Sequence, residues 1–171
     1  MMARFRQAVA SLTAHTYALW SAATGREDRD AFASHLFLVC ALATAAHLVL
    51  LVHQLSAWVL LNDVPFLAIA ARAGIDQRWR RSMPERLFPG AAQLTADLAA
   101  VEALFDLGMI VFARGTGHRV DVRVADMVDS LAWTLAVYAL LFPPSRRRHR
   151  SELSERVHRL LRRWAQAPAG A

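Results

Sequence analysis

Long apolar segments separated by short charged segments dominate the chain. Residues 31–52 contain no charged side chain, and about 22 residues are enough for a helix to cross a hydrocarbon core of roughly 30 Å. Residues 124–142 form a second apolar segment, which Pro143 and Pro144 end because proline cannot continue a helix. Both segments predict membrane-spanning helices.

Two further apolar segments are interrupted by polar residues. Residues 56–71 include Asn62, Asp63 and Pro65, so they form either a second, kinked span or a surface loop that follows an extended first helix. Residues 91–113 are apolar apart from three carboxylates and predict another span. These carboxylates are Asp97, Glu102 and Asp106.

The segment between these two, residues 72–90, is polar and basic. It predicts a loop or a short surface helix, with Trp79 at the level of the lipid headgroups, where tryptophan is enriched. A turn is expected at residues 114–119, which include Gly115 and Gly117.

The amino-terminal segment, residues 1–24, predicts an amphipathic helix that lies on the membrane surface. Its apolar positions recur at helical spacing, at Phe5, Val9, Leu12, Thr16 and Leu19. The alternative is a soluble surface helix that packs on another subunit. Either structure needs one apolar face and one polar face.

The carboxy-terminal segment, residues 145–164, predicts a basic amphipathic helix bound to anionic lipid, with packing on a partner protein as the alternative. Residues 165–171 are expected to be disordered. Arginines occupy the positions between the apolar residues of the helix. The expected lipid-binding residues are Arg146, Arg147, Arg148, Arg150, Arg159, Arg162 and Arg163.

The distribution of arginine decides between four spans and three. With four spans, the amino-terminal segment, residues 72–90 and the tail share one side, which carries about 17 arginines, and arginine in short flanking loops favours the cytoplasm. The sequence therefore predicts an all-α, multi-pass transmembrane helical bundle over residues 31–143. We expect it in a bacterial inner membrane, with both termini cytoplasmic.

Composition narrows the class of protein further. Hydrophobic residues make up 56% of the chain, and Cys40 is the only cysteine, which excludes a disulfide framework. The net charge of +6 is typical of nucleic-acid-binding proteins. However, the arginines lie in short runs beside apolar segments, so we expect lipid headgroups as partners and no nucleic acid.

Enzyme motifs do not occur in the sequence. The chain has no Gly-rich phosphate loop, no G-x-S-x-G and no H-E-x-x-H. We therefore expect a non-enzymatic accessory or assembly subunit of a larger membrane complex, with other membrane protein subunits among its partners.

Carboxylates inside the predicted spans are the first candidate site, because a lone charge in lipid is costly. Glu102 and Asp106 share a helix face, and so do Asp126 and Asp129. We expect Asp106 and Asp129 at a similar depth, roughly 10 Å below the outer surface. One interpretation is a small proton or cation carrier that uses Glu102, Asp106 and Asp129. The other is that these groups are neutral or paired with Arg114 or Arg123.

Histidine in the first predicted span is the second candidate site. His35 and His47 lie about 18 Å apart along a helix, so they cannot share a metal ion. His47 is therefore either a single axial ligand of a cofactor or a hydrogen-bonded structural residue.

Residues 27–58 resemble the α-type light-harvesting antenna polypeptides of purple bacteria. The matching residues are Glu27-Asp28-Arg29, Phe32, Ala43-x-x-x-His47 with the leucines after it, and Trp58. The resemblance implies that His47 ligates the magnesium of bacteriochlorophyll and that Trp58 bonds a pigment carbonyl. The protein would then be a pigment-binding subunit. Antenna polypeptides cross the membrane once, so the later segments depart from that family.

Residues 25–32 are similar to the opening of a family of small bacterial inner-membrane proteins of unknown function. The matching residues are Gly25-Arg26-x-x-Arg29-x-x-Phe32. That family's Arg-Leu-His-Asp signature is missing from the basic loop of this chain. The resemblance implies about four spans and implies nothing about chemistry.

Overall fold

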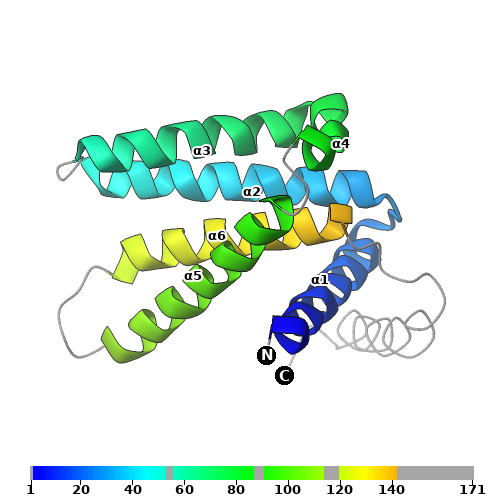
Figure 1. Cartoon of the computed structure of the whole chain (residues 1–171), viewed down its shortest axis with the longest axis horizontal. Coiled ribbons are helices and arrows are strands. Elements are labelled where there is room, and N and C mark those ends of the chain that lie inside the picture. The colour runs from blue at the N-terminus through cyan, green and yellow to red at the C-terminus, as the bar shows by residue number, and fades with distance from the viewer. Residues whose placement is uncertain (1, 53–55, 87–90, 114–119, 142–171) are drawn as a thin grey trace, which may run out of the picture.

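The computed structural model is all-α, as predicted (Figure 1). It describes residues 2–52, 56–86, 91–113 and 120–141, with backbone only at Trp58, at residues 83–86 and at Ala113. The described helices are α1 (Met2–Thr24), α2 (Arg29–Leu50), α3 (Ala57–Ile75), α4 (Gln77–Arg86), α5 (Ala91–Ala113) and α6 (Val120–Leu141).

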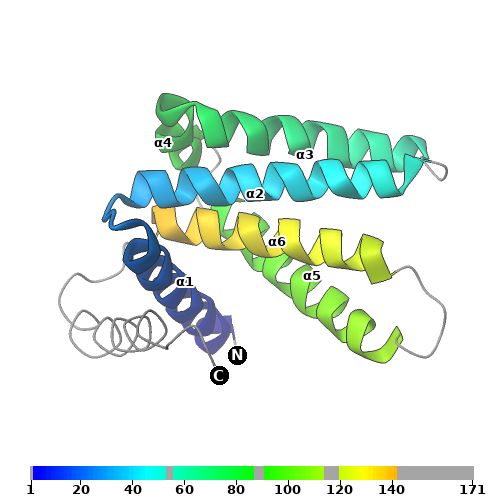
Figure 2. The same cartoon turned by 180° about the vertical axis from the view of Figure 1, so that it is seen from behind.

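Four long helices form an antiparallel bundle. Figures 1 and 2 show α3 beside α2, α2 beside α6, and α5 crossing α6 on the other side. Because the chain reverses between successive helices, the start of α2, α4 and the end of α6 lie at one end, which we call the α4 end. The end of α2 and the start of α6 lie at the opposite end, which we call the His47 end. Helix α1 packs against α6.

Small residues allow the helices of the bundle to approach closely. Ala96 of α5 and Ala136 of α6, for example, are fully buried. On α3, a methyl group at Gly74 would lie 2.7 Å from the side chain of Leu38. The Ser34 hydroxyl of α2 also donates a hydrogen bond to the Gly74 carbonyl at 2.5 Å. Close packing through small residues is typical of helix contacts within membranes.

Three aromatic rings fill the middle of the bundle. The Trp133 ring of α6 lies 5.4 Å from the Phe37 ring of α2 and 4.8 Å from the Phe66 ring of α3, measured between ring centroids. Both distances fall in the range of favourable aromatic pairs. This contact fixes three helices against one another.

Helix boundaries follow side-chain caps. Asp28 caps α2 by accepting a hydrogen bond from the Asp30 amide, and Ser56 accepts one from the Val59 amide at the start of α3. Asp76 accepts one from the Trp79 amide at the start of α4. That hydrogen bond is the main reason why the pKa of Asp76 lies below its usual value of 3.8.

The structure shows a helix in each of the two segments for which the sequence left a loop as an alternative, residues 56–71 and 72–90. Residues 56–71 belong to a separate helix that continues past Pro65, so they are neither a loop nor an extension of the first helix. Helix α4 corresponds to the short helix that we considered for residues 72–90. We predicted that the apolar segment ends at residue 71, because Arg72 is charged. Arg72 instead lies in the last turn of α3, which ends at Ile75.

Membrane crossing is supported by length and composition for two helices. Within the described part of the chain, α2 and α6 are long and apolar enough to span a bilayer. Helix α6 is the more enclosed of the two, as the central helix of a soluble protein would also be. Helix α5 is as long, but it carries the three carboxylates noted above.

Helix α5 has an unusual distribution of side chains. Its buried face consists of small or acidic residues, namely Ala92, Ala96, Asp97, Ala100, Ala103 and Asp106. Its outer face consists mainly of large apolar residues, each more than half exposed, namely Leu94, Leu98, Val101, Leu104, Phe105, Val111 and Phe112. One carboxylate, Glu102, is also exposed. In water the opposite arrangement would be expected.

Both ends of the chain were expected to form amphipathic surface helices. Helix α1 covers the expected range, and it turns Val9 and Thr13 inward while Leu12 and Leu19 stay exposed. The turn at residues 114–119, the basic tail at residues 145–164 and the last residues, 165–171, lie outside the described residues. The same holds for the expected lipid-binding residues, Arg146, Arg147, Arg148, Arg150, Arg159, Arg162 and Arg163.

Candidate functional site

Three helices meet around His47 at the His47 end of the bundle. Antiparallel packing brings the last turn of α2 beside the first turns of α6. As a result, His47 Nδ1 lies 2.5 Å from Asp126 Oδ1 and 3.7 Å from Asp63 Oδ2 of α3. The side chains of all three are mostly buried, at 13%, 21% and 14% exposure respectively.

Asp129 completes this group one helical turn further along α6. Its carboxylate is buried, with 8% of the residue exposed, and it accepts a hydrogen bond from the Thr44 hydroxyl at 3.1 Å. Thr44 lies three residues before His47 and therefore on the same face of α2. Among the described residues, no arginine or histidine lies within ion-pair distance of Asp129.

The ligand atoms of His47, Asp126 and Asp129 all lie within 4.8 Å of one another. We call these three residues the His47 cluster. The sequence placed Asp126 and Asp129 on one helix face, and the structure adds a histidine from another helix. From the sequence we excluded a metal ion shared by His35 and His47. A site that combines His47 with carboxylates of another helix was not predicted.

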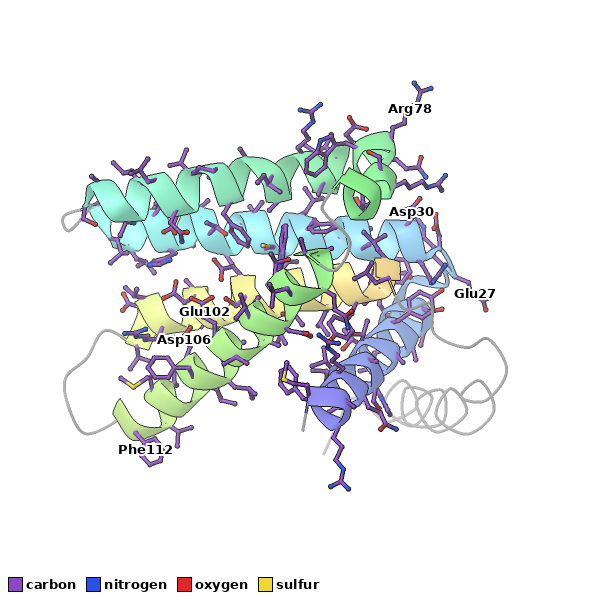
Figure 3. All side chains as sticks on the ribbon, in the orientation of Figure 1. Glu27, Asp30, Arg78, Glu102, Asp106 and Phe112 are labelled. Carbon is purple, nitrogen blue, oxygen red and sulfur yellow. The ribbon has the colours of Figure 1, made fainter. Side chains whose placement is uncertain are left out.

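On the other side of α6, Glu102 and Asp106 of α5 have separate partners. Asp106 is buried and accepts a hydrogen bond from Arg123 Nη1 at 3.0 Å, while Glu102 accepts one from the Ser130 hydroxyl at 3.2 Å. Figure 3 shows both carboxylates where α5 faces α6. The pairing of Asp106 with Arg123 is one of the two interpretations that the sequence offered. Asp106 and Asp129, which we expected at a similar depth, have different partners.

A third buried carboxylate, Asp97, lies near the α4 end. It receives two hydrogen bonds from other helices, from Arg6 Nε of α1 at 2.8 Å and from the Tyr138 hydroxyl of α6 at 2.6 Å. Sequence reasoning noted Asp97 but not these partners. Arg6 and Asp97 are 91 residues apart, so nothing local in the sequence indicates their contact.

Basic residues at the α4 end are partly turned inward. Arg80 is buried, donates to the Ala73 carbonyl at 2.5 Å and lies 3.5 Å from Asp30 of α2. Arg81 also pairs with Asp30. Figure 3 shows Asp30 and Arg78 at this same end. These contacts attach α4 to α2 and explain part of the arginine content of residues 72–90.

The residues suggested by the antenna resemblance are placed in two helices. His47 lies in α2 with its Nδ1 atom against Asp126, and Trp58 lies in α3, with its side chain outside the described residues. His35 is exposed and contacts the ring of Trp20, at 5.6 Å between centroids. Pigment binding by His47 stays a prediction.

Comparison of the chain with known protein families, with curated proteins and with solved structures finds no match. The site is therefore interpreted from its charges. Negative groups outnumber positive groups in this part of the bundle, as far as the structure describes it. Arg123 pairs with Asp106, and His47 lies beside Asp63 and Asp126. Asp129 and the exposed Glu102 accept hydrogen bonds from hydroxyl groups.

Proposed function

We propose that the protein is an integral membrane helical bundle whose polar interior binds cations, and that it acts as a small cation carrier. The observation that carries this proposal is the excess of carboxylates over positive groups near the His47 end, above all the buried Asp129, which pairs with no arginine among the described residues. Burying an ion without compensation is expensive, so such an interior needs a metal cation or protons to balance it.

A membrane location is supported by the side chains of α5. Large apolar residues such as Leu98 and Phe112 face outward, whereas Asp97 and Asp106 face inward. This distribution suits hydrocarbon outside and polar contacts inside, because lipid chains solvate leucine well and carboxylates poorly. The two apolar helices α2 and α6 agree with it.

Four spans with both termini in the cytoplasm of a bacterium remain the topology that we propose. The antiparallel order of α2, α3, α5 and α6 suits it, since the α4 end would then carry the arginine-rich segments on one side (Figures 1 and 2). Reporter fusions at Ala171 and at Gly117 test this arrangement. Activity of a periplasm-specific reporter at Ala171 would exclude it.

Transport is tested with the full chain in proteoliposomes. Fluorescent dyes inside the vesicles would report entry of protons, Na⁺, K⁺, Mn²⁺ and Zn²⁺ in turn. We expect flux of at least one of these cations above that of protein-free vesicles, and loss of that flux in Asp129→Asn. Asp121→Asn is the matched control, because Asp121 lies on the exposed side of the same helix. No flux of any tested cation would contradict the proposal.

An accessory or assembly subunit of a larger membrane complex is the second candidate. Exposed Leu12 and Leu19 on α1 favour it, because they provide an apolar surface that a neighbouring subunit would cover. In that case Asp129→Asn leaves assembly of the complex nearly unchanged, and the isolated protein carries no cation. An absorption spectrum of the purified protein tests the pigment-binding alternative, which requires bacteriochlorophyll bands.

A further inference from the structure

We infer that His47, Asp126 and Asp129 form a binding site for a divalent transition-metal ion between α2 and α6. This inference rests on the proposed cation binding and names the class of cation. The three donors come from two helices that are 70 residues apart at their nearest ends, Leu50 and Val120. Their convergence is therefore a property of the fold and not of a local run of acidic residues.

The distances suit a small ion. The donor atoms lie within 4.8 Å of one another, and the shortest pair, His47 Nδ1 and Asp126 Oδ1, lies at 2.5 Å. Nitrogen and oxygen ligands at about 2.0–2.2 Å from a metal ion lie roughly 3–4 Å apart. Small rotations of the carboxylates about their side-chain bonds would bring Asp129 closer and would open the contact between His47 and Asp126 to admit the ion. The site lies in the last turn of α2 and the first turns of α6, near the His47 end of the bundle.

The types of donor atom indicate which metal ions the site would bind. One imidazole nitrogen with two carboxylates suits Zn²⁺, Mn²⁺ or Fe²⁺, which accept mixed nitrogen and oxygen ligands. Ca²⁺ and Mg²⁺ prefer sites made of oxygen alone. Three protein ligands also leave a coordination position open for water or for transfer of the ion.

Neighbouring residues hold the ligands in place, which is a feature of built metal sites. The Thr44 hydroxyl, which also contacts the Cys40 carbonyl at 3.0 Å, donates to Asp129. Asp63 of α3 lies near the His47 ring. Asp129 is also more than nine-tenths buried, and no arginine among the described residues pairs with it, so His47 is the positive neighbour that the structure gives it.

The experiment titrates the purified full chain, stripped of metal and without an affinity tag, with Co²⁺ and then with competing Zn²⁺. We expect one Co²⁺ per chain, with visible absorption bands typical of nitrogen and oxygen ligands. His47→Gln and Asp129→Asn should each weaken binding by at least tenfold, and Thr44→Val by about tenfold, because supporting contacts typically contribute that much.

Two matched variants control for unspecific binding. His35→Gln changes an exposed histidine of the same helix as His47, and Asp121→Asn changes an exposed carboxylate of the same helix as Asp129. Both should bind Co²⁺ like the wild type. Equal loss in His47→Gln, in Asp129→Asn and in both controls, or no binding in the wild type, would overturn the inference. Helical circular dichroism of each variant separates loss of ligands from loss of the fold.

The two proposals fail in different ways. If the protein carries protons or monovalent cations but binds no Co²⁺, the metal site is wrong and the carrier stands. If it binds Co²⁺ at His47 and Asp129 but shows no flux of any cation, the metal site stands and the carrier is wrong.

Discussion

Asp97 of α5 and Asp129 of α6 are both buried carboxylates, but the two regions around them differ. Asp97 has Arg6 and Tyr138 as partners, whereas Asp129 has the hydroxyl of Thr44. Tyr138 lies nine residues after Asp129, or about 13 Å along the helix. One region thus contains a compensated charge that links three helices, and the other contains a charge that still needs a cation.

The difference separates structural from functional charge. Removing one member of a buried, paired group leaves its partners unsatisfied and costs stability. Removing a buried charge that has no positive partner relieves a cost instead. Mutation of the aspartate should therefore lower the free energy of unfolding at Asp97 and leave it equal or raise it at Asp129.

The largest expected effect is at Asp97. Asp97→Ala leaves the buried Tyr138 hydroxyl without its acceptor and Arg6 without its partner, so we expect the free energy of unfolding to fall by about 2–3 kcal/mol. Arg6→Gln should cost less, because the Arg6 side chain is 43% exposed. Thermal unfolding in detergent measures both. If the Asp97→Ala protein is as stable as the wild type, the proposed difference between Asp97 and Asp129 is wrong.

A second change tests packing at the α4 end without altering a charge. Gly74→Ala would place a methyl group 2.7 Å from the Leu38 side chain and 3.3 Å from the Leu38 amide nitrogen. We expect it to destabilise the protein by about 1–3 kcal/mol, as overpacking usually does. Co²⁺ affinity at the His47 cluster should stay unchanged. A weaker affinity would show that the two ends of the bundle are coupled.

The third expected effect is at Asp129 and has the opposite sign. Asp129→Asn keeps the shape and can still accept the Thr44 hydrogen bond, so unfolding free energy in the absence of metal should stay equal or rise by about 1 kcal/mol. The same thermal unfolding assay, with chelator present, measures it. A loss as large as that of Asp97→Ala would indicate that Asp129 has a structural role.

The smallest effect concerns an exposed carboxylate, Asp76, which serves as a reference for the two buried ones. The hydrogen bond from the Trp79 amide lowers its pKa below 3.8. A lowered pKa means that its contribution to stability is present above the unfolded pKa and is lost as pH falls through the folded value, that is, below about pH 4. The protection factors of the α4 amides against hydrogen exchange, corrected for the intrinsic exchange rate at each pH, should therefore fall in acid, and less so in Asp76→Asn.

Local patterns in the sequence predicted most of the helices. Residues 31–52 and 124–142 correspond to α2 and α6, because a long apolar run leaves few alternatives to a helix. The spacing of Asp126 and Asp129 correctly placed both on one helix face. Likewise, Asp106 and Arg123 flank a short connection, so their pairing was foreseeable from proximity in the chain.

Contacts between distant helices were not predictable in the same way. His47 meets Asp126 only because α2 and α6 pack antiparallel in one register, and a helix rotation or a shift by one turn would separate them. The contact between Arg6 and Asp97 depends equally on how α1 lies against the bundle. Helix periodicity fixes which residues share a face but not which faces meet.

The position of α6 in the chain has a consequence for biosynthesis. Helix α6 contacts α1, α2 and α5, yet it is the last of the described helices to leave the ribosome. About 80 residues separate His47 from Asp129, and at about 5–20 residues per second their synthesis takes roughly 4–16 s. During that interval the earlier helices lack the element that joins them. Nascent chains that end before Val120 should therefore be degraded faster by quality-control proteases than the full chain.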